Sequence, residues 1–133
     1  MNVCYLAIGS NLGDRRENLN KALREIKNLK QTKIIKVSKF IQTKPVGGPS
    51  NQGLFLNAAL KIKTSILPSE LLNNIKRIED SLGRKRAVHW GPRVIDIDML
   101  LYSDLTVDKF NLKIPHPRMM KRSFVLNPLL EVL

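Results

Sequence analysis

The chain of 133 residues is poor in cysteine, in aromatic residues and in acidic residues. Its one cysteine, Cys4, cannot form a disulfide within the chain, which fits the reducing cytoplasm, where we expect the protein. No apolar run approaches the ~20 residues that span a bilayer. The N-terminus has neither the basic start nor the long apolar stretch of a secretory signal. We therefore expect one domain, residues 1–133, with no membrane partner.

The shortage of acidic residues leaves a net charge of +12, from 23 Lys and Arg against 11 Asp and Glu. Such an excess indicates an anionic partner: nucleic acid, an anionic membrane surface or a small polyphosphate. Aromatic residues make up only 5%, few for a protein that stacks single-stranded bases. The lysines of residues 21–39 alternate with apolar residues, which is typical of a solvated face. The arginines at 84, 86, 93, 118 and 122 instead cluster with Gly, Pro, His and Trp, outside any amphipathic pattern.

The apolar periodicity predicts an α+β fold of order β-α-β-β-α-β. Such an order is typical of a ferredoxin-like fold, in which a four-stranded antiparallel sheet has helices on one face and leaves the other open for a site. The expected elements are a strand at 3–9, a helix at 14–29, strands at 33–44 and 54–65, a helix from Pro68 to Gly83, a strand at 93–101, an irregular stretch and a short helical tail from Met120.

The strand "RVIDIDMLL" carries two aspartates on one face. Side chains alternate along a strand, so Asp96 and Asp98 point the same way, about 7 Å apart, and repel by about 2 kcal/mol at an effective dielectric near 20. The same alternation places Leu101 on the opposite, helix-packed face and Tyr102 beside the aspartates. A solvated sheet face is one explanation of the pair.

A metal site is the other explanation. Mg²⁺ is commonly held by one or two carboxylates together with substrate phosphates, and paired ions clamp attacking and leaving oxygens. Arg93 directly precedes the pair, and Arg84 lies in the loop before it, where they are placed to grip phosphate oxygens. No "GxxxxGK[ST]" loop is present. The stretch "IGSNLG" resembles a glycine-rich phosphate-binding loop only weakly and is more typical of a strand-to-helix turn. The local pattern therefore favours a magnesium-bound nucleotide polyphosphate.

Two further residues, Trp90 and His116, carry both an ordinary and a functional interpretation. Trp90 lies in the arginine-rich loop and either caps the core or covers a site. His116 lies between two prolines and either stabilises a turn or donates to phosphate, which Arg118 and Arg122 nearby favour. On pattern alone, Asn57 is a satisfied strand residue and Glu79 a surface charge.

Several stretches together resemble the 6-hydroxymethyl-7,8-dihydropterin pyrophosphokinases of folate biosynthesis. The matching stretches are "YLAIGSNLGDR" (5–15), "FLNAAL" (55–60), "RIEDSLGR" (77–84), "HWGPRVIDIDMLLY" (89–102) and "IPHPRMMKRSFVLNPLLE" (114–131). The resemblance covers nearly the whole chain. It implies that ATP donates its β,γ-pyrophosphoryl group to the hydroxymethyl group of 6-hydroxymethyl-7,8-dihydropterin, releasing AMP. It also implies a ferredoxin-like fold, two Mg²⁺ ions and loops that close over the site.

The resemblance also implies roles for particular residues. Asp96 and Asp98 correspond to the metal ligands, and with Arg84 and Arg93 they form the expected catalytic group. The expected ATP contacts are Glu79, Arg84, Trp90, Arg93, His116 and Arg122. The expected pterin contacts are Thr43, Pro45, Val46, Phe55, Asn57, Trp90 and Phe124. The chain has His89 where the family pattern has an arginine. We therefore expect the partners to be small-molecule substrates rather than nucleic acid. We also expect a functional link to other enzymes of the folate pathway.

Two other functions remain open at this stage. Ferredoxin-like sheets can present an open face to single-stranded RNA, although such a face usually carries two or three aromatic residues and no acidic pair. The second alternative function is that of a different ATP-dependent kinase with the same fold, because a fold alone does not determine the reaction.

Overall fold

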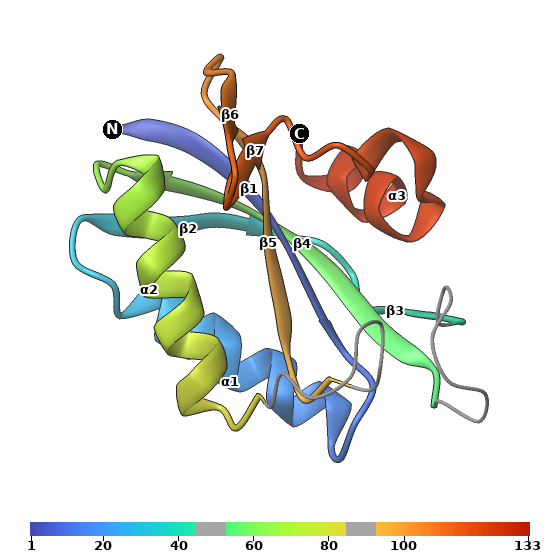
Figure 1. Ribbon diagram of the computed structural model, residues 1–133. Helices are drawn as coiled ribbons and strands as arrows, with labels where there is room; N and C mark the ends of the chain where they lie inside the picture. Colours follow the sequence, from blue (N-terminus) through green and yellow to red (C-terminus); the bar gives the residue numbers. More distant parts are fainter. Residues whose placement is uncertain (45–52, 85–92) are drawn as a thin grey trace.

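The computed structural model describes residues 1–44, 53–84 and 93–133 (Figure 1). Its main sheet is antiparallel, in the order β2-β4-β1-β5, with β3 also paired to β4. The strands are β1 (Asn2–Ser10), β2 (Thr32–Val37), β3 (Ile41–Thr43), β4 (Phe55–Thr64) and β5 (Asp96–Tyr102). The predicted α+β ferredoxin-like class is thereby confirmed.

The strand expected at 33–44 is divided into β2 and β3, which both pair with β4. Ser38 lies at the break. Its N–H donates to the Ala59 carbonyl at 2.9 Å, and its Oγ accepts from the Ala59 N–H at 2.8 Å. The Ser38 hydroxyl thus takes the place of a backbone carbonyl as the hydrogen-bond acceptor for β4. The order of the strands in the sheet is unchanged.

Helices α1 (Arg15–Lys27) and α2 (Pro68–Ser81) cover one face of the sheet (Figure 1). Asp14 caps α1 by accepting from the Glu17 N–H at 3.1 Å. Pro68 occupies the first turn of α2, and Gly83, with φ of +94°, follows its end, as the sequence predicted. The core between helices and sheet contains Leu6, Ile8, Leu19, Ala22, Ile26, Leu60, Ile62, Leu71, Ile75, Ile78, Ile97 and Met99.

The other face of the sheet is partly covered by α3 (Ser123–Val132), which forms the helical tail predicted from Met120 but begins only at Ser123 (Figure 1). Leu129 and Val132 of this helix pack with Ala59 and Leu100. The remainder of the face, towards the start of β5, is not covered by α3 and forms the pocket described below.

Within the stretch expected to be irregular, β6 (Val107–Lys109) and β7 (Leu112–Ile114) form a hairpin, followed by a 3₁₀ turn, Met119–Lys121. In the part of the chain that the structure describes, no helix is both long and apolar enough to cross a membrane.

A bulge in β5 corrects the predicted alternation at the end of that strand. Leu6 pairs with Met99 but Tyr5 pairs with Leu101, so Leu100 is an extra residue. Leu101 therefore packs on the α3 side, and Tyr102 is buried on the helix side, where its hydroxyl donates to the Ile66 carbonyl at 2.6 Å. The two aspartates precede the bulge, so both remain on the face opposite α1 and α2.

Candidate active site

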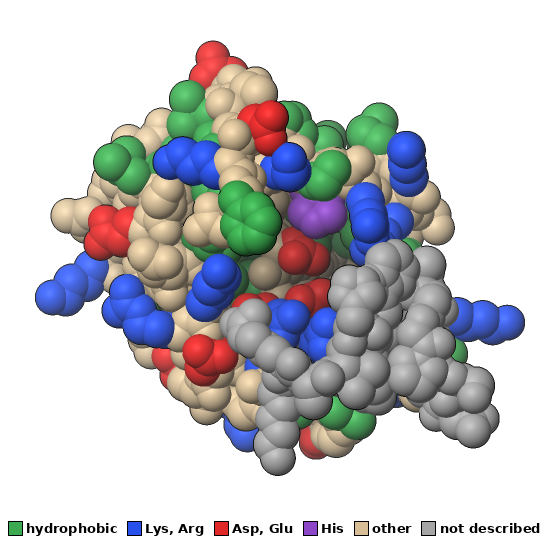
Figure 2. All heavy atoms as spheres, viewed as in Figure 1, with side chains coloured by type: hydrophobic (Ala, Val, Ile, Leu, Met, Phe, Trp, Pro, Cys, Tyr) green, Lys and Arg blue, Asp and Glu red, His purple; other side chains and the backbone are tan. Residues whose placement is uncertain are grey.

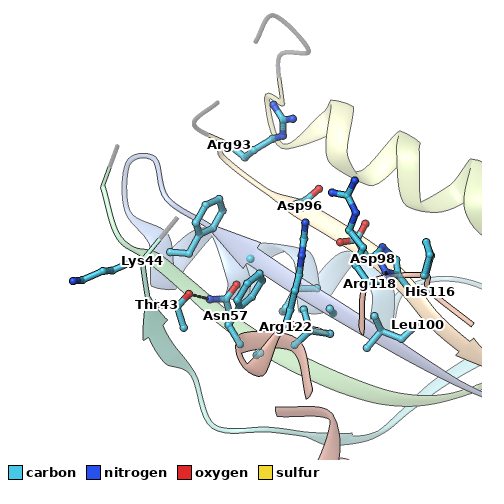
Figure 3. Close-up of a pocket in the computed structure, with 18 residues that line it drawn as sticks. Thr43, Lys44, Asn57, Arg93, Asp96, Asp98, Leu100, His116, Arg118 and Arg122 are labelled. Atoms are coloured by element: carbon cyan, nitrogen blue, oxygen red, sulfur yellow. Dashed lines mark hydrogen bonds between the residues drawn. The ribbon is translucent and has the colours of Figure 1, made fainter. Parts of the chain in front are cut away.

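A pocket of about 450 Å³ opens where β1, β4 and β5 meet the start of α3 and the segment 116–118 (Figure 3). Figure 2 shows acidic side chains and a histidine next to one another in a hollow of this face, with Lys and Arg side chains around them. The predicted site residues that line the pocket are Thr43, Phe55, Asn57, Arg93, Asp96, Asp98, His116, Arg122 and Phe124.

Other predicted residues lie elsewhere. Pro45, Val46 and Trp90 are outside the described residues. Glu79 and Arg84 do not line the pocket but lie against it, because Arg84 forms an ion pair with Asp96. The sequence interpretation did not single out the Lys44 side chain, and it named Arg118 only as a neighbour of His116; both residues line the pocket.

Asp96 and Asp98 form the acidic part of the pocket (Figure 3). Asp96 Oδ1 accepts from Arg84 Nη1 at 2.8 Å. Burial, and to a lesser extent the nearby carboxylates of Asp96 and Glu79, together raise the pKa of Asp98 to about 8, against the opposite effect of Arg84 and Arg122. Without a cation, Asp98 therefore holds its proton near neutral pH.

Glu79 is buried next to the β5 segment that carries the two aspartates. Only 3% of its surface is exposed, and its Oε2 accepts from the Ile97 N–H at 2.9 Å, between the two aspartates along β5. The same oxygen forms an ion pair with Arg84. Burial raises the pKa of Glu79, although the Ile97 N–H and Arg84 both oppose this. Arg84 thus joins the end of α2 to the edge of the sheet.

A ring of basic groups surrounds the acidic pair: Arg93, His116, Arg118 and Arg122 (Figure 3). The backbone of Arg93 is fixed by Asn11, whose Oδ1 accepts from the Arg93 N–H at 2.7 Å and whose own N–H donates to the Arg93 carbonyl at 3.0 Å. Asn11, read from the sequence only as a turn residue, therefore positions a candidate phosphate ligand.

The other half of the pocket is formed by aromatic and amide groups. Phe55 of β4 and Phe124 of α3 line it, and the Arg122 guanidinium lies 5.5 Å from the centroid of the Phe124 ring. Asn57, 8% exposed, donates from Nδ2 to Thr43 Oγ1 at 2.6 Å (Figure 3). A Cβ atom at Gly9 would lie 2.8 Å from Asn57 Oδ1, so the missing side chain leaves room for this amide.

The donor set fits Mg²⁺. Among the residues that the structure describes, no three or more His, Cys, Asp or Glu side chains come together as a metal site made by the protein alone, so the aspartate pair is the relevant donor set. Two carboxylates without further protein ligands suit Mg²⁺, which keeps several waters and takes its other ligands from substrate phosphates. A bound cation would also favour the ionised form of Asp98, which the protein alone disfavours.

Comparison with known proteins connects this pocket to one family. The family profile described as 7,8-dihydro-6-hydroxymethylpterin-pyrophosphokinase matches residues 5–133. The chain is 45% identical over 131 residues to the 2-amino-4-hydroxy-6-hydroxymethyldihydropteridine pyrophosphokinase of Bacillus subtilis (strain 168), covering 98% of this chain and 78% of that protein. It is 47% identical over 132 residues to the protein of the same name from Aquifex aeolicus (strain VF5), covering 99% and 81%.

A third relative is larger. The chain is 46% identical over 133 residues to the bifunctional protein FolKE of Lactococcus lactis subsp. lactis (strain IL1403), covering all of this chain but 38% of that protein. A profile match over nearly the whole chain and relatives of this identity lead to one conclusion: the chain belongs to the 7,8-dihydro-6-hydroxymethylpterin-pyrophosphokinase family.

Proposed function

We propose that the chain transfers the β,γ-pyrophosphoryl group of ATP to the hydroxymethyl group of 6-hydroxymethyl-7,8-dihydropterin, with Mg²⁺ held by Asp96 and Asp98. Family membership supports pyrophosphoryl transfer in folate biosynthesis. The observation that carries the finer assignment is the division of one pocket into an acidic and basic half and an aromatic and amide half. The first suits a metal-bound triphosphate, and the second suits a flat polar heterocycle.

In the first half, Asp96 and Asp98 are the proposed ligands of two Mg²⁺ ions. When bound, the ions neutralise the charge on the phosphate oxygens. Arg93, Arg118 and Arg122 surround the same space and are proposed to hold phosphate oxygens, which arginine binds in a bidentate manner. Arg84 and Glu79 support Asp96 and β5 from behind.

In the second half, Phe55 and Phe124 are proposed to contact the two faces of the pterin ring. Thr43 occupies one N–H of the Asn57 amide, so Oδ1 and the second N–H remain to bind the polar edge of the ring. The expected contacts of Pro45 and Val46 with the pterin, and of Trp90 with both substrates, stay predictions.

The reaction follows from this placement. The hydroxymethyl oxygen forms a bond to the β-phosphorus of ATP, and the bond between that phosphorus and the oxygen bridging to the α-phosphate breaks. AMP leaves with the bridging oxygen, and the hydroxyl proton is lost to solvent. The chain's own contribution is to position both substrates and to offset negative charge, which is most of what phosphoryl-type transfer requires.

Product analysis with Mg²⁺, ATP and 6-hydroxymethyl-7,8-dihydropterin tests the proposal. We expect AMP and the pterin diphosphate in equal amounts. ADP as the sole nucleotide product would instead indicate an ordinary kinase. Tight RNA binding that falls steeply with salt, without any transfer, would favour the RNA-binding alternative.

A link to a second enzyme is a smaller proposal. The matched region forms part of a relative named as bifunctional, which supports a functional connection between this domain type and another activity.

Replacing Phe124 with alanine should weaken pterin binding by about 10- to 100-fold, as expected for an aromatic group worth roughly 1.5–3 kcal/mol when covered. Nucleotide affinity should change much less. Calorimetry with each substrate measures both. Phe110→Ala is the matched control, because that ring is fully exposed at the β6–β7 turn. Equal losses for both substrates would contradict the assignment of Phe124.

Gly9→Ala should also act on the pterin half. The added Cβ would lie 2.8 Å from Asn57 Oδ1, closer than such contacts allow, so the amide must turn away from its present position. We expect a higher KM for the pterin, an unchanged KM for ATP and a small fall in Tm. Gly53→Ala is the control, because the nearest atom to its added Cβ among the described residues is the Asn11 carbonyl oxygen at 3.4 Å. An unchanged pterin KM would remove the proposed role of Asn57.

A further inference from the structure

His116 is held in an unusual sequence context, between Pro115 and Pro117. Its backbone N–H donates to the Leu100 carbonyl at 2.9 Å, which attaches the segment to β5. Pro117 has no N–H to offer, and the next backbone amide, that of Arg118, donates to His116 Nδ1 at 3.2 Å. The chain therefore supplies the imidazole with one donor at a fixed place.

This hydrogen bond determines where the ring proton lies. A neutral imidazole has one nitrogen that donates and one that accepts, whereas a charged imidazolium has two donors. Because Nδ1 accepts from the Arg118 N–H, it carries no proton, and the single proton must be on Nε2. Within the described residues, no other group forms a hydrogen bond with Nε2.

The electrostatic setting agrees with a neutral ring. Burial lowers the pKa of His116 most, and the nearby charge of Arg122 lowers it further; Asp96 opposes this in part, and Arg118 adds a smaller lowering effect. The charge that offsets the phosphates must then come from the arginines and the metal. His116 is left to provide a directional hydrogen bond.

We propose that the Arg118 backbone N–H is a positioning group that fixes neutral His116 as the Nε2–H tautomer, so that the ring donates to a nucleotide phosphate. The other tautomer would present a lone pair to the phosphate oxygens and repel them. The side chain and the backbone of Arg118 thus have separate tasks. This inference rests on the proposed function, because it takes the bound anion to be a nucleotide.

Nitrogen NMR of the ¹⁵N-labelled, ligand-free protein at pH 7 tests the tautomer directly. The chain has two histidines, so His89→Gln identifies the signals of His116. We expect an unprotonated Nδ1 and a protonated Nε2. A protonated Nδ1, or an imidazolium with both nitrogens protonated, would overturn the proposal. This readout is independent of catalysis.

Two matched variants test the donor. His116→Gln places an amide N–H near the position of Nε2, whereas His116→Asn places its amide near Nδ1 only. Affinity for a non-hydrolysable MgATP analogue should stay within about threefold of wild type for the glutamine variant. It should fall about tenfold or more for the asparagine variant, in line with roughly 1.5–3 kcal/mol for a hydrogen bond to a charged group. Thermal denaturation confirms that both variants fold.

The outcomes separate the two proposals. An asparagine variant that binds as well as the glutamine variant would overturn the role of the Nε2–H donor. A wild-type protein that binds no nucleotide would overturn the proposed function, while the NMR experiment would still decide the tautomer.

Discussion

Asp98→Asn should reduce pyrophosphoryl transfer by about a thousandfold or more, the loss expected when roughly 4 kcal/mol of electrostatic stabilisation disappears. Asparagine keeps the shape of the side chain and removes its charge, so the effect isolates the proposed metal ligand. The rate in a single turnover, measured across a range of Mg²⁺ concentrations, is the test. A variant with the wild-type rate would remove the metal assignment and, with it, the mechanism proposed for this pocket.

The same substitution should stabilise the metal-free protein at high pH. Burial raises the pKa of Asp98 to about 8 in the folded state, from an ordinary value of 3.8. Between these values the folded state holds a proton that the unfolded state has released, so this group makes stability fall as pH rises towards and through 8. Asp98→Asn cannot ionise and lacks this dependence. In EDTA, the Tm of the variant should therefore exceed that of wild type increasingly between pH 5 and pH 9.

Asp108→Asn is the control for both measurements. Asp108 lies on β6, 81% exposed, where its ion pair with Lys113 lowers its pKa. Its replacement should leave transfer unchanged and should not produce a rising stability difference with pH. A parallel rise for both variants would show that the pH effect is not specific to the buried aspartate.

The sequence predicted the parts of this site that depend on local periodicity. The alternation of β5 placed Asp96 and Asp98 together, because side chains on one strand have a period of two, and the same period puts Phe55 and Asn57 of β4 side by side in the pocket. The prediction failed at Tyr102, which the bulge at Leu100 turns to the helix side. Pairing with β1 determines that bulge, and no pattern within the strand reveals it.

Contacts between segments far apart in the sequence could not be predicted from local sequence patterns either. Asn11 reads as a turn residue, yet the fold brings it to the backbone of Arg93, 82 residues away. Glu79 reads as a surface acid on α2, yet it lies under β5, where it accepts from the Ile97 N–H. Resemblance to a family marked Glu79 as functional, but only the structure shows which groups it contacts.

Arg84→Gln should slow transfer strongly and yet tighten the binding of a metal ion in the absence of nucleotide. In the ligand-free protein, Arg84 donates to Asp96 at 2.8 Å and forms an ion pair with Glu79, so a positive charge already occupies one side of the proposed metal ligand. A cation that binds Asp96 must compete with this arginine. Removing the charge should lower the dissociation constant for Mn²⁺ alone several-fold, which calorimetry or electron paramagnetic resonance can measure.

Transfer should nevertheless fall by about 100- to 1,000-fold, the range typical of losing one preorganised donor. The Nε atom of Arg84 is buried and has no hydrogen-bond partner among the residues that the structure describes, and the side chain is only 12% exposed. A buried donor without an acceptor is unfavourable, so a phosphate oxygen delivered to this place would gain a hydrogen bond that the ligand-free protein does not make. The arginine would thus change partners, from Asp96 before the metal binds to phosphate afterwards.

Two controls make this interpretation specific. Arg24→Gln removes an exposed ion pair with Glu17 on α1 and should affect neither metal binding nor transfer. Loss of Arg84 also breaks the buried ion pair with Glu79, at a stability cost of about 3–5 kcal/mol. The double variant Glu79→Gln/Arg84→Gln removes both members of the ion pair and should recover much of the lost stability while keeping the tighter Mn²⁺ binding. If Arg84→Gln bound Mn²⁺ more weakly than wild type, the arginine would be organising the aspartates for the metal rather than competing with it, and the proposed exchange of partners would be wrong.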